Sequence, residues 1–263
     1  MMRTLSSNKT SSSQQGFTLV EMSVVLLVIG LILGAVSIGK DVQRNAEYMK
    51  VKQKFIDQWA TAYNDYYLRT GVVLADSQTD PRFMVNGALY GTPTPGTVLS
   101  GGDMTGVTSP GELCDALLMK EMDRTGVRMP PGRAEGYEDR YVYLDTNGNP
   151  QEAHVCFQWN PPTSPSNSGN VMVIKGLTPD LARTLDQEID GKADAREGMF
   201  RQDTVLNSTS GVPGVEWAGN NTNGMPNGFS PGNACSGGTA TGTTPNLDED
   251  QVCVYTAHYK MNQ

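Results

Sequence analysis

The hydrophobic positions of this 263-residue chain are concentrated near its N-terminus. Residues 1–16 are mostly small and polar, whereas residues 17–38 are apolar or small except for two serines, Thr18 and Glu21. About 22 residues at 1.5 Å each make a helix of roughly 33 Å, enough to cross the hydrocarbon core of a bilayer. The pattern therefore predicts a membrane-spanning helix. A carboxylate is costly inside such a helix, so Glu21 is a candidate functional residue.

Apolar residues continue to recur after the span, at alternating steps of three and four positions, as far as residue 69. This period is typical of a helix that lies with one face on a protein core. The expected core stripe comprises Val42, Ala46, Met49, Ile56, Ala60, Tyr63 and Tyr67, widened by Phe55, Trp59 and Tyr66. We therefore expect one helix over residues 17–69, of which residues 17–38 span the membrane, with Thr70-Gly71 as its C-terminal stop.

Residues 70–263 follow this helix and are numerous enough for a globular head with its own core. The expected elements are helices at residues 112–121 and 178–190 and strands at residues 140–144, 153–159, 171–175 and 251–259. Ser109-Pro110 and Thr178 are the expected helix caps, and Asn147-Gly148 predicts a tight hairpin turn between the first two strands. These elements indicate an α+β fold, with the long N-terminal helix packed on an antiparallel sheet.

The composition predicts long loops in the head. Apolar residues make up only 38% of the chain, which also contains 29 glycines and 15 prolines. Residues 71–111 and 207–250 are especially rich in Gly, Thr, Asn and Pro, and we expect both to be loops. The formal net charge is −8, so the chain lacks the surplus of Lys and Arg that binds phosphates. Nucleic acid is therefore not an expected partner.

The four cysteines of the chain are Cys114, Cys156, Cys235 and Cys253. They form no C-x-x-C pair, which disfavours a zinc or thioredoxin-type site. An even number of cysteines in an exported head is typical of disulfides. Three pairings are open. We favour Cys114 with Cys156 and Cys235 with Cys253, because each bond then closes a local loop.

Two acidic segments bear on metal binding. Asp145, Asn147 and Asn149 match the first three ligand places of a calcium loop, but Cys156 occupies the place of the bidentate glutamate, so a hairpin is the favoured interpretation. The second group of carboxylates, near one turn, comprises Asp186, Glu188, Asp190 and Asp194. Such a group is a candidate calcium site. The favoured interpretation is a solvated helix end followed by an Asp-Gly turn, with no cofactor.

The sequence contains no convincing catalytic constellation. It lacks the G-x-S-x-G, Walker, H-E-x-x-H and Rossmann glycine patterns. Its two histidines, His154 and His258, both fall in predicted strands, where we expect packed or surface residues and not bases or ligands. We therefore expect that the protein is not an enzyme.

The six residues Gly16-Phe17-Thr18-Leu19-Val20-Glu21, with the apolar run behind them, resemble the N-terminus of type IV prepilins and of the pseudopilins of type II secretion. The resemblance covers about residues 16–54, and the head is similar only in general plan. It implies cleavage after Gly16, N-methylation of Phe17, and extraction from the inner membrane into a helical filament. Many pilins carry a proline late in the apolar run, where this chain has Ile38 and nearby glycines.

The resemblance divides the chain into a leader at residues 1–16, the long helix at residues 17–69, and a head at residues 70–263 with a C-terminal disulfide loop. It implies a type IV pilin-like fold and a structural subunit of a type IV pilus, major or minor. The alternatives are a pseudopilin of a type II secretion system and a membrane-anchored binding domain that does not polymerise. The implied partners are the prepilin peptidase/N-methyltransferase, other pilin subunits and the inner-membrane assembly platform.

The resemblance also implies a location in the bacterial inner membrane, with one span and a periplasmic head, before assembly into an extracellular pilus or a periplasmic pseudopilus. Basic residues after the span outnumber those of the leader, which by itself favours a cytoplasmic head. The motif and the cysteines favour export. The amine released at Phe17 would lie one helical turn from Glu21, and we expect the two to pair within one chain or between neighbouring chains.

Overall fold

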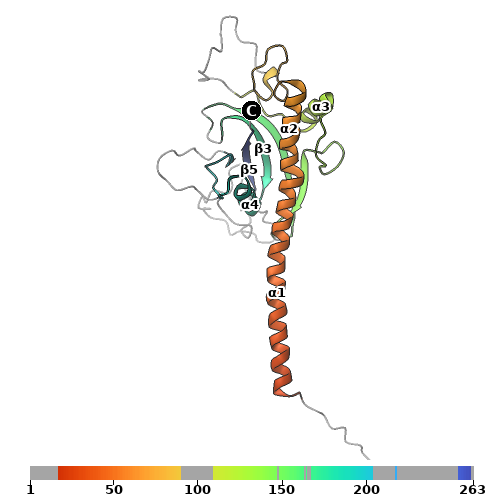
Figure 1. The fold of residues 1–263 in the computed structure, drawn as a ribbon, viewed down its shortest axis with the longest axis vertical. Coiled ribbons are helices and arrows are strands. Elements are labelled where there is room, and N and C mark those ends of the chain that lie inside the picture. Colours follow the sequence, from red (N-terminus) through yellow and green to blue (C-terminus); the bar gives the residue numbers. More distant parts are fainter. Residues whose placement is uncertain are drawn as a thin grey trace, which may run out of the picture. The chain divides into compact units, whose positions relative to one another are not determined.

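The computed structural model describes residues 17–89, 109–146, 148–162, 164, 167–203, 217 and 254–261, without the side chains of residues 37, 38, 40 and 41. The chain divides into two compact units, Met1–Gln43 and Arg44–Gln263, each with its own internal contacts. Figure 1 shows the elements of both units coloured along the chain.

The first unit contains the greater part of helix α1 (Leu19–Val51). Its segment Leu19–Val36 has a mean hydropathy of 2.6, and none of that segment is buried in the structure. By length and composition it is the one helix among the described residues that can cross a membrane. The helix runs without a break through Gly30, Gly34 and Gly39, in agreement with the predicted span.

Beyond α1 the chain stays helical through a π-helical turn, η1 (Lys52–Ile56), and then α2 (Asp57–Thr70). The predicted stop is confirmed, because Gly71 adopts a left-handed conformation with φ of 73° and donates its N–H to the Tyr67 carbonyl. The π turn was not predicted. It lets Lys52 Nζ reach a carboxylate oxygen of Asp57 five positions on, at 3.0 Å.

The predicted core stripe of this helix is confirmed in part. The residues that are buried against the head are Tyr48, Val51, Phe55, Ile56, Trp59, Ala62, Tyr63 and Tyr66, five of which were predicted. Val42, Ala46 and Tyr67 are exposed instead, and Met49 and Ala60 are only partly buried. Two physical causes account for the difference. Large aromatic side chains gain more from burial than alanines do, and the π turn shifts the phase of the residues behind it.

The sheet contains five antiparallel strands in the order β1-β2-β3-β5-β4. The strands are β1 (Arg140–Leu144), β2 (Pro150–Asn160), β3 (Gly169–Leu177), β4 (Phe200–Gln202) and β5 (Tyr255–Lys260). The four predicted strands are present, although β5 begins later than expected and residues 251–253 lie outside the described part. Strand β4 has only three residues and was not predicted.

The predicted hairpin between β1 and β2 is present. The register pairs Leu144 with Pro150, so residues 145–149 connect the strands, and the Gly148 N–H closes a turn on the Asp145 carbonyl at 3.0 Å. Asp145 closes this loop, because its Oδ1 accepts the Asn149 N–H at 2.8 Å and its Oδ2 accepts the Gln151 amide at 3.2 Å. The Asp145 carboxylate is thus engaged by the protein itself. Asn147 lies outside the described residues.

The core forms where α2 and the end of α1 pack across β1 and β2 (Figure 1). Phe157 lies at its centre, with ring centroids 6.1 Å from Trp59 and 5.3 Å from Tyr63. Successive side chains of a strand point to opposite faces. Phe157 and Val155 therefore face the helix, whereas His154 and Cys156 lie on the other face of the sheet.

Helix α3 (Asp115–Thr125) begins three residues later than predicted, and Ser109-Pro110 does not cap it. Residues before it are held extended along β2: Leu113 exchanges backbone hydrogen bonds with Phe157, at 2.7 and 3.0 Å. The helix can start only where this pairing ends, so its N-cap is Cys114, which makes no side-chain cap bond. This correction places Asp115 beside the sheet.

Helix α4 (Pro179–Asp190) has the predicted bounds and ends at Gly191, whose φ is 77°. Leu181 and Leu185 are fully buried. Thr178 occupies the N-cap position, but the predicted side-chain cap is wrong, because its Oγ1 makes no hydrogen bond. The Tyr143 hydroxyl accepts the Thr178 backbone N–H instead, at 3.0 Å, which ties the start of α4 to β1.

Candidate functional site: the start of the long helix

The first turn of α1 is closed by a reciprocal set of hydrogen bonds between Thr18 and Glu21. Glu21 Oε2 accepts the Thr18 backbone N–H and the Thr18 hydroxyl, both at 2.8 Å. Thr18 Oγ1 accepts the Glu21 backbone N–H at 3.3 Å. This is the capping box of a Thr-x-x-Glu sequence, which satisfies N–H groups that a helix N-terminus leaves unpaired. The spacing of Thr18 and Glu21 was the sequence signal for it, and the sequence analysis missed it.

The capping box fixes where the Glu21 carboxylate lies. Its Oε2 is 2.8 Å from the backbone nitrogen of Thr18, and that nitrogen belongs to the residue directly after Phe17. Phe17 itself is 82% exposed, and Gly16 lies outside the described residues. A carboxylate at this place also faces the positive end of the helix macrodipole. Cleavage before Phe17 would create a new cationic amine on the residue that precedes Thr18. The Thr18 backbone nitrogen already holds the Glu21 carboxylate in place.

A scan against protein families matches residues 11–37 to the prokaryotic N-terminal methylation motif. This match joins the end of the polar leader, the Gly16-Phe17 junction, the capping box and the apolar part of α1 in one recognised pattern. The chain carries the prepilin motif of type IV pilins and pseudopilins. Neither a search of curated proteins nor a search of solved structures found a match to the chain.

The prepilin motif implies processing by a prepilin peptidase and assembly into a polymer of pilin-type subunits. Together with the apolar helix near the N-terminus, it indicates anchoring in a membrane before assembly. The antiparallel sheet that follows the long helix along the chain fits the α+β fold expected for such a subunit. The motif characterises structural proteins and not enzymes.

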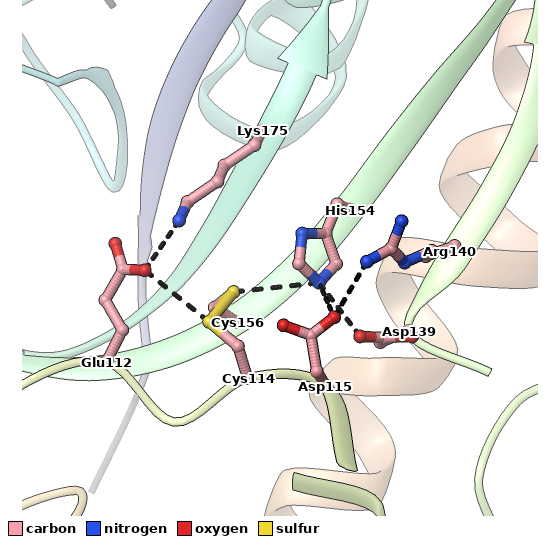
Figure 2. Close-up of a disulfide and its surroundings, with 8 residues drawn as sticks. All are labelled: Glu112, Cys114, Asp115, Asp139, Arg140, His154, Cys156 and Lys175. Atoms are coloured by element: carbon pink, nitrogen blue, oxygen red, sulfur yellow. Dashed lines mark hydrogen bonds and ion pairs between the residues drawn. A yellow bond between two sulfur atoms is a disulfide. The ribbon is translucent and has the colours of Figure 1, made fainter. Parts of the chain in front are cut away.

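Within the head, the structure contains one disulfide among the described cysteines, between Cys114 and Cys156. This is the favoured pairing of the sequence analysis, and it joins the residue before α3 to β2, with Cα atoms 4.6 Å apart (Figure 2). Cys235 and Cys253 lie outside the described residues, so their pairing stays a prediction.

The acidic turn after α4 is organised by hydrogen bonds to its own backbone. Asp186 Oδ2 accepts the Asp194 N–H and the Trp217 indole N–H, both at 2.6 Å. Asp190 accepts the backbone N–H groups of Met199 and Phe200, at 3.0 and 2.8 Å, while Asp194 Oδ1 accepts those of Arg196 and Glu197, both at 2.9 Å. Glu188 is exposed and takes no part in these bonds. The carboxylates thus shape the connection to β4, and calcium binding here stays a prediction.

Gly198 has a part in the same turn. Its φ is 86°, and a Cβ built on it would lie 2.2 Å from Asp190 Oδ2. The backbone can therefore approach the Asp190 carboxylate closely only because residue 198 is glycine.

Asp186 makes the stability of the head dependent on pH. Burial raises the pKa of its carboxyl from 3.8 to about 7, and the nearby Asp190 acts in the same direction. At pH values between 3.8 and about 7, the folded chain therefore keeps a proton on Asp186 that the unfolded chain has released. The contribution of Asp186 to the stability of the head is therefore full below about pH 4 and is lost as the pH rises to about 7. We expect Asp186→Asn, which resembles the protonated acid, to remove this loss.

The measurement is chemical denaturation of the full chain in detergent at pH values from 4 to 8. Glu188→Gln is the matched control, because Glu188 is an exposed carboxylate two positions along the same helix. We expect this control to keep the pH dependence of the parent. A parallel loss of stability in the parent and in Asp186→Asn would show that Asp186 does not cause it.

Proposed function

We propose that the chain is a structural subunit of a type IV pilus, assembled through α1 after removal of the leader. One observation carries the proposal: an apolar helical segment with no buried residue, Leu19–Val36, begins at the Thr18–Glu21 capping box within the methylation motif. Outside a membrane, such a helix is stable only if other apolar surfaces cover it. The same helix of neighbouring subunits supplies that cover.

Apolar burial alone does not set the register of a filament, because it is not directional. The Glu21 carboxylate and the Phe17 amine of a neighbouring subunit are the charged pair that this end of the helix offers. Buried charge pairs add little net stability, and setting a register is their best-attested role. We therefore infer that the Glu21–Phe17 pair sets the register of the filament. The apolar residues of α1 hold the subunits together.

The proposed route begins in the inner membrane, with the head in the periplasm. A prepilin peptidase/N-methyltransferase cleaves after Gly16 and methylates Phe17, and an assembly platform then moves the subunit into the polymer. The motif is shared by pilins and by the pseudopilins of type II secretion. The place of the filament, outside the cell or within the periplasm, separates these two functions. Nucleic acid is not an expected partner of this acidic chain.

The test is the intact mass of the subunit in filaments sheared from the cell surface. We expect a chain that begins at Phe17 and carries one methyl group on its amine. Gly16→Val is the control, because a bulkier residue at the junction should leave the leader attached. A filament subunit that still contains residues 6–15 would contradict the processing step. Processed chains found only in the periplasm would favour the pseudopilin.

A further inference from the structure

Three metal-ligating side chains meet on the face of the sheet that is turned away from α2. They are Asp115 at the start of α3, Asp139 directly before β1, and His154 in β2 (Figure 2). One ligand atom from each lies within 4.8 Å of the others. From its place in a predicted strand, His154 was expected to be a packed or surface residue, because only the fold brings the three side chains together.

The distances in this cluster converge on one nitrogen. His154 Nε2 is 2.8 Å from Asp139 Oδ2 and 3.5 Å from Asp115 Oδ1. The Asp139 side chain is 1% exposed, that of His154 18% and that of Asp115 57%. The cluster therefore has a buried carboxylate at its base and an opening to solvent on the side of Asp115. A small cation can reach the imidazole nitrogen from that side.

The backbone holds all three residues in place. The Asp139 carbonyl accepts the Val155 N–H at 2.8 Å. This bond continues the pairing of the hairpin, so it holds Asp139 beside the residue that follows His154. The disulfide between Cys114 and Cys156 fixes Asp115 against β2, two residues from His154. Ligands held on paired strands and a cross-linked helix start lose little freedom when they bind an ion.

The charged side chains around the cluster carry a net negative charge, which favours the binding of a cation. Arg140 Nη2 donates to Asp115 Oδ1 at 2.8 Å, and Arg140 Nη1 donates to Glu152 at 3.1 Å. Arg133 also binds Glu152, at 2.7 Å. The carboxylates of residues 115, 139 and 152 thus outnumber the two guanidinium groups by one negative charge. Arg140 binds the same Asp115 oxygen that lies 3.5 Å from His154 Nε2, so the ion shares Oδ1 with the guanidinium or binds the other oxygen, Oδ2.

We propose that Asp115, Asp139 and His154 bind one divalent transition-metal ion, with Zn²⁺ as the best-fitting ion. An imidazole and two carboxylates are a ligand set for Zn²⁺ or Mn²⁺, whereas Ca²⁺ and Mg²⁺ prefer oxygen ligands alone. The ion takes the place of the hydrogen bond between His154 Nε2 and Asp139 Oδ2. Three protein ligands leave a fourth position open to water. The neighbouring group of Glu112, Cys114 and Cys156 is not part of this site, because both of its cysteines are used in the disulfide.

The experiment is a calorimetric titration of Zn²⁺ into the full chain in detergent, after removal of metal with a chelator. We expect one Zn²⁺ per chain, and at least about tenfold weaker binding in Asp115→Asn and in His154→Gln. Asp115 is more than half exposed, so the first variant should fold normally even if His154→Gln proves less stable. Asp80→Asn is the control, because the Asp80 side chain is an exposed carboxylate outside the cluster that also pairs with an arginine.

The control should bind Zn²⁺ as the parent does, and an excess of Ca²⁺ should not displace the ion. The site is refuted if Zn²⁺ does not bind to the parent. It is equally refuted if Asp115→Asn retains the affinity of the parent, because the ion is then held elsewhere on the chain. Both outcomes are independent of filament assembly.

Discussion

Glu21→Gln should leave the subunit folded and inserted in the membrane, yet largely absent from filaments. Glutamine keeps the shape of the side chain and can still accept the hydrogen bonds of the capping box, because Glu and Gln both serve at this position. Only the charge is lost. Removing one member of a buried charge pair strands the other, here the Phe17 amine of a neighbour, at a cost of about 3–5 kcal/mol. Since each 1.4 kcal/mol is a factor of ten, incorporation should fall more than tenfold.

The measurement compares the amount of variant in the membrane fraction with the amount in sheared filaments. Thr18→Val is the matched control, because it removes the cap hydroxyl and keeps the Glu21 charge. It should weaken the first turn by about 1 kcal/mol and still enter filaments. If Glu21→Gln is incorporated at the level of the parent, the carboxylate does not set the register. If Thr18→Val fails as completely as Glu21→Gln, the cap and not the charge is the essential feature.

Trp59→Ala should be the most damaging single truncation in the unit Arg44–Gln263, lowering its free energy of unfolding by about 3–5 kcal/mol. The Trp59 side chain is fully buried between α2 and the sheet and packs on Phe157. Its indole N–H donates to the Glu138 carbonyl at 3.2 Å, so the truncation also leaves that carbonyl without this partner. The cavity and the lost bond act in the same direction.

Chemical denaturation of the full chain in detergent measures this loss, with circular dichroism as the signal. Leu68→Ala is the matched control on the same helix, because Leu68 is 78% exposed. We expect it to change stability by less than about 0.5 kcal/mol. Equal effects of the two substitutions would mean that α2 does not pack on the sheet through the Trp59 face.

Elements whose cause lies within a few residues were predictable. The end of α2 at Gly71 and the end of α4 at Gly191 follow from the one residue type that adopts a left-handed conformation at no steric cost. The capping box of Thr18 and Glu21 belongs to the same class, since its partners are three residues apart. The Thr-x-x-Glu spacing in the sequence was sufficient to predict this capping box, which was not expected beforehand.

Elements whose cause lies in distant residues were not predictable. The start of α3 is displaced because Leu113 pairs with Phe157, far away in the chain. Here a local preference yields to contacts that form only once the sheet exists.

The sequence by itself determined the apolar helix, the methylation motif at residues 11–37 and the charged residue in the first turn. These depend on composition and on neighbours within about one helical turn. The tertiary structure alone decided that Tyr48, Val51 and Ala62 belong to the buried face of that helix, because the choice depends on how aromatic residues fit the sheet and on the π turn at Lys52–Ile56. It alone gathered Asp115, Asp139 and His154 into one cluster. Strand pairing and a disulfide, and no pattern of spacing, bring those three side chains within reach of a single ion.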